Sequence, residues 1–150
     1  MIRHATALVL IFLLSAGAYA QDVTYRKHIR PLWEARCSTC HGAASPEGAV
    51  FDENKEKFAA LSQGPRMDSY TALLSFVAWP DTGALMRRLD DGKSTADKKP
   101  GNMYVNLGNS EEERQRNLAL FKQWVGTDAW TLKKPDAITK EELLRIKAKY

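Results

Sequence analysis

The sequence predicts an all-α fold, and three observations support this prediction. Strand patterns are almost absent from the 150 residues. Residues 110–125 carry apolar side chains at helical spacing, and Ser110 with Glu113 forms the pattern of a capping box. A Cys-x-x-Cys-His motif, residues 37–41, follows another segment of helical spacing. We expect about four to five helices in the main body and a further helix near the C-terminus.

The first helices are predicted from prolines and capping residues. Pro31 fits the first turn of a helix that begins near residue 30 and runs into the cysteines. A short helix is expected over residues 54–61. Asp68 is expected to cap the next helix, which Pro80 ends.

The second half of the chain contains a long loop between helices. A short helix is expected over residues 83–89. Residues 90–108 have no apolar periodicity, and loops of this length in compact domains are usually functional. The helix that begins at Ser110 should end at Gly126. A last helix is expected over residues 139–149, behind a second capping box.

The first twenty residues have the pattern of a secretory signal peptide. Arg3 precedes an apolar run over residues 7–14, and the segment ends in Ala18-Tyr19-Ala20. This run is too short to span a bilayer, and no later stretch could do so. We therefore expect three parts: a leader (1–20), a main domain (21–126) and a C-terminal extension (127–150). The mature chain should be periplasmic, with no membrane anchor.

Composition excludes several classes of protein. The net charge of +4 is small and evenly spread, which argues against binding of nucleic acid. Two cysteines cannot build a disulfide-rich scaffold or a four-cysteine metal site. No catalytic triad, carboxylate dyad or phosphate-binding loop is apparent, so we do not expect an enzyme.

The motif Cys37-Ser38-Thr39-Cys40-His41 indicates covalent attachment of haem c. Both thiols can form thioethers with one porphyrin, and His41 can then supply the proximal ligand to iron. The same cysteines could instead form a redox disulfide, a zinc site or a structural disulfide. A redox motif usually follows a strand, a zinc site needs more ligands, and a structural disulfide leaves His41 without a role.

The second axial ligand is predicted among three methionines. Met103 lies in a polar loop that offers no core for it to fill, so it is the favoured distal ligand. Met86 lies in a helical segment, where packing is the commoner use of methionine, and it is the main alternative. Met67 is a third candidate. Weaker candidates are His28, Lys98 and Lys99.

Residues 23–126 resemble the class I cytochrome c family. The resemblance lies in the haem motif after an N-terminal helix, the methionine loop and the aromatic C-terminal helix. It implies the cytochrome c fold around one haem, attached at Cys37 and Cys40 and ligated by His41 and Met103. It also implies a proline about a dozen residues after the histidine, whose carbonyl orients the imidazole. Here Pro46 follows His41 by only five residues.

These features predict a periplasmic one-electron carrier. It would be a monomer that meets redox protein partners at an exposed haem edge, in a respiratory, metal-oxidation or sulfur-oxidation pathway. Two alternatives stay open. One is a gas-binding or sensing haem protein with an open sixth site, and the other is a haem subunit of a larger oxidoreductase, suggested by the extension.

Overall fold

The structure is a computed structural model that describes residues 22–150, and the predicted leader, residues 1–20, lies outside them. Every regular element within residues 22–150 is helical, so the predicted all-α class is confirmed. In this part of the chain no helix is both long enough and apolar enough to cross a membrane.

The helices are short, except for one. In chain order the elements are η1 (Tyr25–Ile29, a π-helical turn), α1 (Arg30–Arg36), α2 (Ser38–His41), α3 (Gly48–Glu53), α4 (Lys55–Ala60), α5 (Tyr70–Ser75), α6 (Ala84–Leu89), η2 (Tyr104–Leu107), α7 (Glu111–Val125), η3 (Thr127–Ala129), η4 (Pro135–Ala137) and α8 (Lys140–Leu143).

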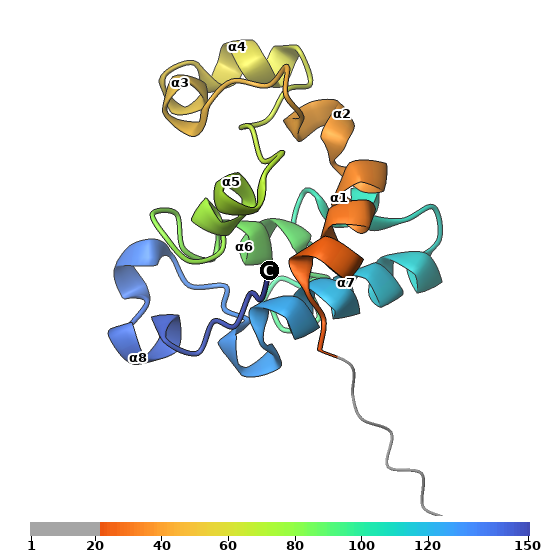
Figure 1. Cartoon of the computed structure of the whole chain (residues 1–150), viewed down its shortest axis with the longest axis vertical. Coiled ribbons are helices and arrows are strands. Elements are labelled where there is room, and N and C mark those ends of the chain that lie inside the picture. Colours follow the sequence, from red (N-terminus) through yellow and green to blue (C-terminus); the bar gives the residue numbers. More distant parts are fainter. Residues whose placement is uncertain (1–21) are drawn as a thin grey trace, which may run out of the picture.

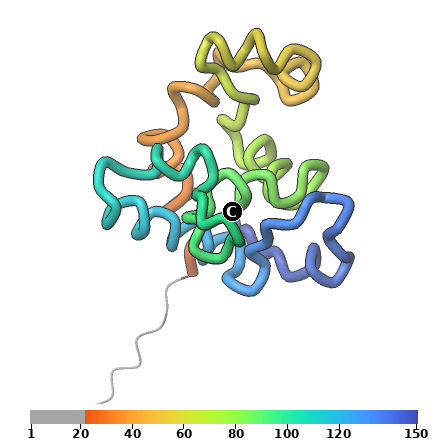
Figure 2. The backbone as a smooth tube through the Cα atoms, turned by 180° about the vertical axis from the view of Figure 1, so that it is seen from behind, coloured from red at the N-terminus to blue at the C-terminus, as the bar shows by residue number. Residues whose placement is uncertain are grey.

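The helices form a body around α7 and a separate pair at one end. In Figure 1, η1, α1 and α6 lie over α7, whereas α3 and α4 lie at the opposite end of the molecule. The view from behind shows the same separation (Figure 2). Neither α3 nor α4 contributes a buried residue. The buried core therefore belongs to the body: Tyr25, Ile29, Trp33, Leu73, Val77, Leu85, Met86, Leu89, Tyr104, Leu107, Leu118, Phe121, Trp124, Val125, Ala129 and Ala148.

The predicted cap of α7 is confirmed in part. The Ser110 hydroxyl accepts the Glu113 amide N–H at 3.2 Å. The Glu113 carboxylate accepts the N–H of Asn109 (2.7 Å), one residue earlier than a capping box requires. The same carboxylate pairs with Arg36 of α1. This network fixes the start of α7 against the helix that leads to the cysteines.

The predicted cap of α5 is wrong by one residue. The Ser69 hydroxyl caps the helix by accepting the Ala72 N–H at 3.1 Å. Both carboxylate oxygens of Asp68 instead bind the Arg66 guanidinium, at 2.7 and 2.8 Å.

Helix α3 was not predicted, whereas α4 lies within the predicted range 54–61. The two helices are joined by an aromatic contact, since the rings of Phe51 and Phe58 stack at 6.1 Å. Residues 90–108 form the expected long loop, apart from the single turn η2.

The C-terminal helix is shorter than predicted. The capping box of Thr139 and Glu142 is present, but α8 ends at Leu143 rather than 149. The last turn of a helix has carbonyls without partners, and those of α7 bind the tail. Val125 O accepts the N–H of residue 147, and Trp124 O that of Ala148, both at 2.8 Å. These bonds tie residues 147 and 148 to the end of α7, and Ala148 has a positive φ of 35°, so the helix does not continue to the C-terminus. The boundary between the main domain (21–126) and the C-terminal extension (127–150) stays a prediction.

Candidate functional site

The motif residues occupy one helical turn at the junction of α1 and α2. The Cys37 N–H donates to Trp33 O at 2.8 Å. The Cys37 carbonyl then accepts the N–H groups of Cys40 (3.2 Å) and His41 (3.0 Å). Both cysteine side chains are half-buried, and they form no disulfide. The predicted pair of thiols and the histidine therefore lie together on one short, hydrogen-bonded segment.

The imidazole of His41 is buried and held at one nitrogen. Its Nδ1 lies 2.8 Å from the carbonyl oxygen of Pro65. A carbonyl can only accept, so Nδ1 carries the proton and Nε2 is left with a lone pair for iron. The orienting proline that the family resemblance implies is thus Pro65, which follows His41 by 24 residues because α3 and α4 intervene.

Residues 64–67 run beside the Cys-x-x-Cys-His motif and are hydrogen-bonded to it. Gly64 N–H donates to Cys40 O (2.8 Å), and Met67 N–H donates to His41 O (2.9 Å). A Cβ on Gly64 would overlap the imidazole, approaching Nδ1 to 2.5 Å. Only glycine fits so close to the ring. No pattern in the sequence indicates this role of Gly64.

The two main methionine candidates differ in their surroundings. Met86 is fully buried in α6, and its sulfur accepts the Thr131 N–H at 3.2 Å. Met103 is half-buried in the loop before η2, where its N–H donates to Arg88 O at 3.0 Å. The Met103 sulfur lies 3.6 Å from Nδ2 of exposed Asn106, a side chain that can turn away. The Met103 sulfur therefore has a weaker hydrogen bond to the protein than the Met86 sulfur.

Met67 lies near His41, and two of the weaker candidates, His28 and Lys98, already have hydrogen-bond partners. The Met67 N–H donates to the His41 carbonyl, which places Met67 next to the segment that carries the histidine. The ring of His28 accepts the Thr24 N–H at 3.0 Å, within the first helical turn. The Lys98 ammonium donates to the Lys93 carbonyl at 2.7 Å.

The rival uses of the cysteines fit the structure poorly. Burial, with a smaller contribution from Cys40, raises the pKa of the Cys37 thiol to about 11. A redox-active Cys-x-x-Cys motif needs a lowered thiol pKa. Within residues 22–150, no group of three or more His, Cys, Asp or Glu side chains is arranged to hold a metal ion.

The site fits a covalently attached haem on two further observations. The indole N–H of Trp33, one turn before Cys37, is buried and has no acceptor within the described part of the chain. Gly64 packs directly against the imidazole, and the Pro65 carbonyl fixes the orientation of the ring. A group that adds to both thiols and uses Nε2 is therefore compatible with these residues.

Comparison with known proteins decides the family. A family model described as PccH cytochrome c matches residues 24–150. The chain belongs to the PccH cytochrome c family. A solved structure, that of the monohaem cytochrome PccH from Geobacter sulfurreducens, is 60% identical in sequence. The match covers 86% of this chain and 99% of that chain, with a TM-score of 0.79. No curated protein matches.

Membership in the PccH cytochrome c family establishes the cofactor and the kind of activity. The protein carries one covalently bound haem c and transfers electrons, and it is not an enzyme. Haem c supplies the one-electron chemistry of its iron. The protein supplies attachment, axial ligands and the hydrogen bonds that orient them.

Proposed function

We propose that this member of the PccH family is a periplasmic carrier of single electrons. Cys37 and Cys40 hold the haem by thioethers, and His41 is the proximal ligand to iron. The observation that carries this assignment is the hydrogen bond from His41 Nδ1–H to the Pro65 carbonyl (2.8 Å). It fixes the tautomer, orients the ring and strengthens Nε2 as a donor to the metal.

Met103 is the distal ligand in this proposal, and Met86 is the alternative. Met86 fills the core and already uses its sulfur, so withdrawing it would leave both a cavity and the Thr131 N–H without an acceptor. Met103 can turn its sulfur toward iron at the cost of one weak contact to Asn106. Thioether sulfur favours ferrous iron, which suits a carrier.

Fixed ligands on both sides suit electron transfer. His41 is held at Nδ1, and the backbone of Met103 is held by Arg88 O. Neither side chain then has to move when iron changes its oxidation state. A closed sixth position also excludes small molecules, which separates a carrier from a gas-binding protein.

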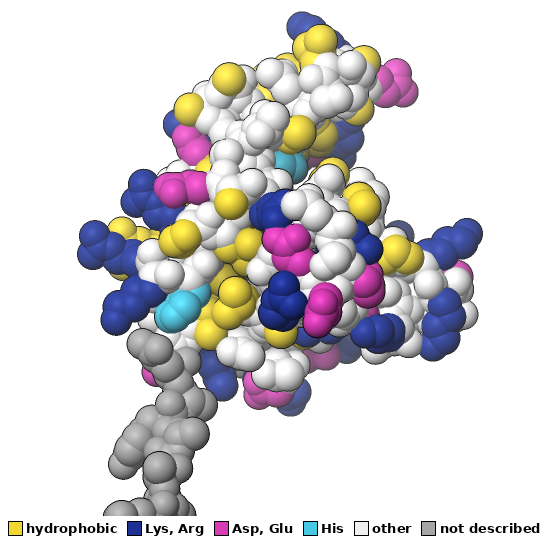
Figure 3. Space-filling model, turned by 90° about the vertical axis from the view of Figure 1, so that its right-hand side faces the viewer, with side chains coloured by type: hydrophobic (Ala, Val, Ile, Leu, Met, Phe, Trp, Pro, Cys, Tyr) yellow, Lys and Arg dark blue, Asp and Glu magenta, His cyan; other side chains and the backbone are white. Residues whose placement is uncertain are grey.

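The partners in this proposal are redox proteins that meet the exposed haem edge of a monomer. On the face at the right of Figure 1, basic and acidic side chains are interleaved, as Figure 3 shows. A surface with both signs of charge favours a small, transient interface rather than strong attraction to a partner of one charge. The predicted leader, residues 1–20, supports a periplasmic location.

The test of this proposal measures the reduction of the haem iron and its binding of carbon monoxide. We expect the purified protein to undergo reversible one-electron reduction, and the spectrum of the ferrous form to stay unchanged under carbon monoxide at neutral pH. Ready formation of a carbon monoxide complex would favour the gas-binding alternative. Gel filtration tests the monomer, and cell fractionation tests the location.

A further inference from the structure

Asp90 is a buried carboxylate that joins two parts of the chain. It ends α6 and is 3% exposed. One carboxylate oxygen accepts the indole N–H of Trp130 at 3.2 Å. The other accepts the backbone N–H of Gly92 at 2.9 Å. The first bond reaches the C-terminal extension, and the second reaches the start of the long loop.

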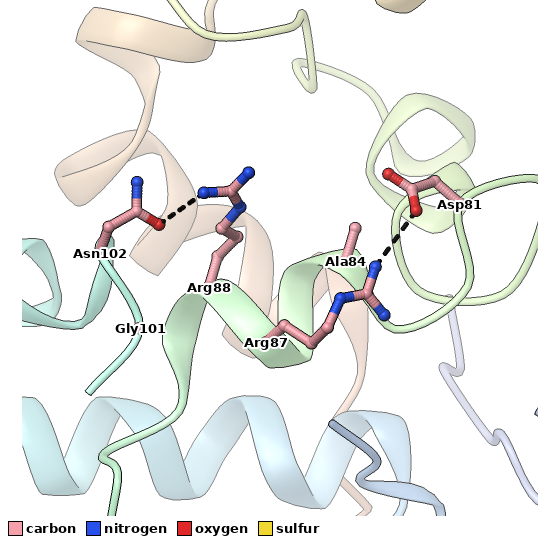
Figure 4. Close-up of a pocket in the computed structure, with 6 residues that line it drawn as sticks. All are labelled: Asp81, Ala84, Arg87, Arg88, Gly101 and Asn102. Carbon is pink, nitrogen blue, oxygen red and sulfur yellow. Dashed lines mark hydrogen bonds and ion pairs between the residues drawn. The ribbon is translucent and has the colours of Figure 1, made fainter. Parts of the chain in front are cut away.

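The backbone around Asp90 holds the loop that carries Met103. The Asp90 carbonyl accepts the N–H of Gly101 at 2.8 Å, and the Arg88 carbonyl accepts that of Met103 at 3.0 Å. A Cβ on Gly101 would come within 2.5 Å of the Arg88 carbonyl carbon. Figure 4 shows Gly101 and Asn102 directly beside α6, with Arg88 bonded to Asn102.

The extension also contacts α6 away from Asp90. The Thr131 N–H donates to the sulfur of Met86 (3.2 Å), and the Arg87 guanidinium donates to the Lys133 carbonyl (2.6 Å). Helix α6 is only six residues long, so its position depends on such contacts rather than on its own stability. The end of α6 is therefore fixed between the extension and the methionine loop.

We propose that Trp130 is a positioning residue for the distal ligand, acting through Asp90 and the end of α6 on the loop of Met103. This inference depends on the proposed role of Met103. Without the indole N–H, one oxygen of a buried carboxylate loses its partner. Asp90 then shifts toward water, and the carbonyls that hold Gly101 and Met103 shift with it. The bond between the Met103 sulfur and iron becomes easier to displace.

The test is Trp130→Phe, which removes the N–H and keeps an aromatic ring. The matched control is Tyr70→Phe, which removes a hydrogen bond to the other end of the extension (Tyr70 OH to Ala148 O, 2.9 Å). We expect the affinity of the ferric holoprotein for imidazole to rise about threefold to tenfold in Trp130→Phe, the scale of one partly lost hydrogen bond to a charged group. Tyr70→Phe should lower thermal stability and leave this affinity unchanged.

Two results would overturn the inference. One is wild-type imidazole affinity in Trp130→Phe, and the other is an equal rise in Tyr70→Phe, which would indicate general loosening. Met103→Ala separates this inference from the proposed function. If the red absorption band of methionine-bound ferric iron persists in Met103→Ala, the ligand assignment fails. If that band is lost but Trp130→Phe behaves as wild type, only the positioning role fails.

Discussion

Substitution of Gly64 by alanine tests the packing of the proximal histidine. The added Cβ would overlap the His41 ring, approaching Nδ1 to 2.5 Å. The φ angle of Gly64 lies outside the left-handed region, so alanine adds no backbone strain and the effect is steric. Forcing a group into a packed site costs about 1–3 kcal/mol. Loss of the His41–Pro65 hydrogen bond costs about 1 kcal/mol more.

We therefore expect Gly64→Ala to lower the free energy of unfolding by about 2–4 kcal/mol, which corresponds to a fall in Tm of roughly 6–12 °C. The assay is urea unfolding of the ferric holoprotein, followed by far-UV circular dichroism. Gly48→Ala is the matched control, because a Cβ there meets only Phe76 at an ordinary 3.9 Å. Wild-type stability in Gly64→Ala, or equal losses in both variants, would refute the packing of Gly64 against the imidazole.

Three further predictions concern other parts of the molecule. Met86→Leu should keep the red band of methionine-bound ferric iron and cost about 1–3 kcal/mol in urea unfolding, because leucine keeps the volume but cannot accept the Thr131 N–H; loss of the band would make Met86 the ligand. Deletion of residues 147–150 should cost at least about 3 kcal/mol. Three backbone hydrogen bonds of 2.8 Å disappear, and the Trp124 indole N–H and the Tyr70 hydroxyl also lose their acceptors on residues 149 and 148; unchanged stability would contradict this. The Asn109 N–H, assisted by Arg36, holds the pKa of Glu113 below its ordinary value near 4.5. Wild type should therefore be more stable than Glu113→Gln at neutral pH, and this difference should decline as pH falls through the lowered pKa. Urea unfolding at several pH values measures the difference, and a difference that does not change with pH would contradict the prediction.

Local signals in the sequence predicted the parts of the fold that depend on local bonds. The caps at Ser110 and Thr139 need only a hydroxyl and an amide three residues later, and both occur. The Cys-x-x-Cys-His motif is also local, and its three functional residues lie on one turn. The predicted capping residue of α5 is off by one: the helix begins at Tyr70, so Ser69 is its cap, and Asp68 pairs with Arg66.

Features that depend on distant partners could not be predicted in this way. The last helix ends early because carbonyls of α7 bind residues 147 and 148. The partner of His41 is Pro65 rather than a nearer proline, because the unpredicted α3 lengthens the segment between them. The bond between Asp90 and Trp130 spans 40 residues, and neither residue has a sequence pattern that indicates it.

The central claim is that the iron is bound by His41 and Met103 in a closed, electron-carrying site. The most direct measurement is the ferric absorption spectrum of wild type beside Met103→Ala at neutral pH. We predict a weak red band of methionine-bound iron in wild type and its loss in Met103→Ala. A wild type without this band, or a Met103→Ala variant that keeps it, would contradict the claim.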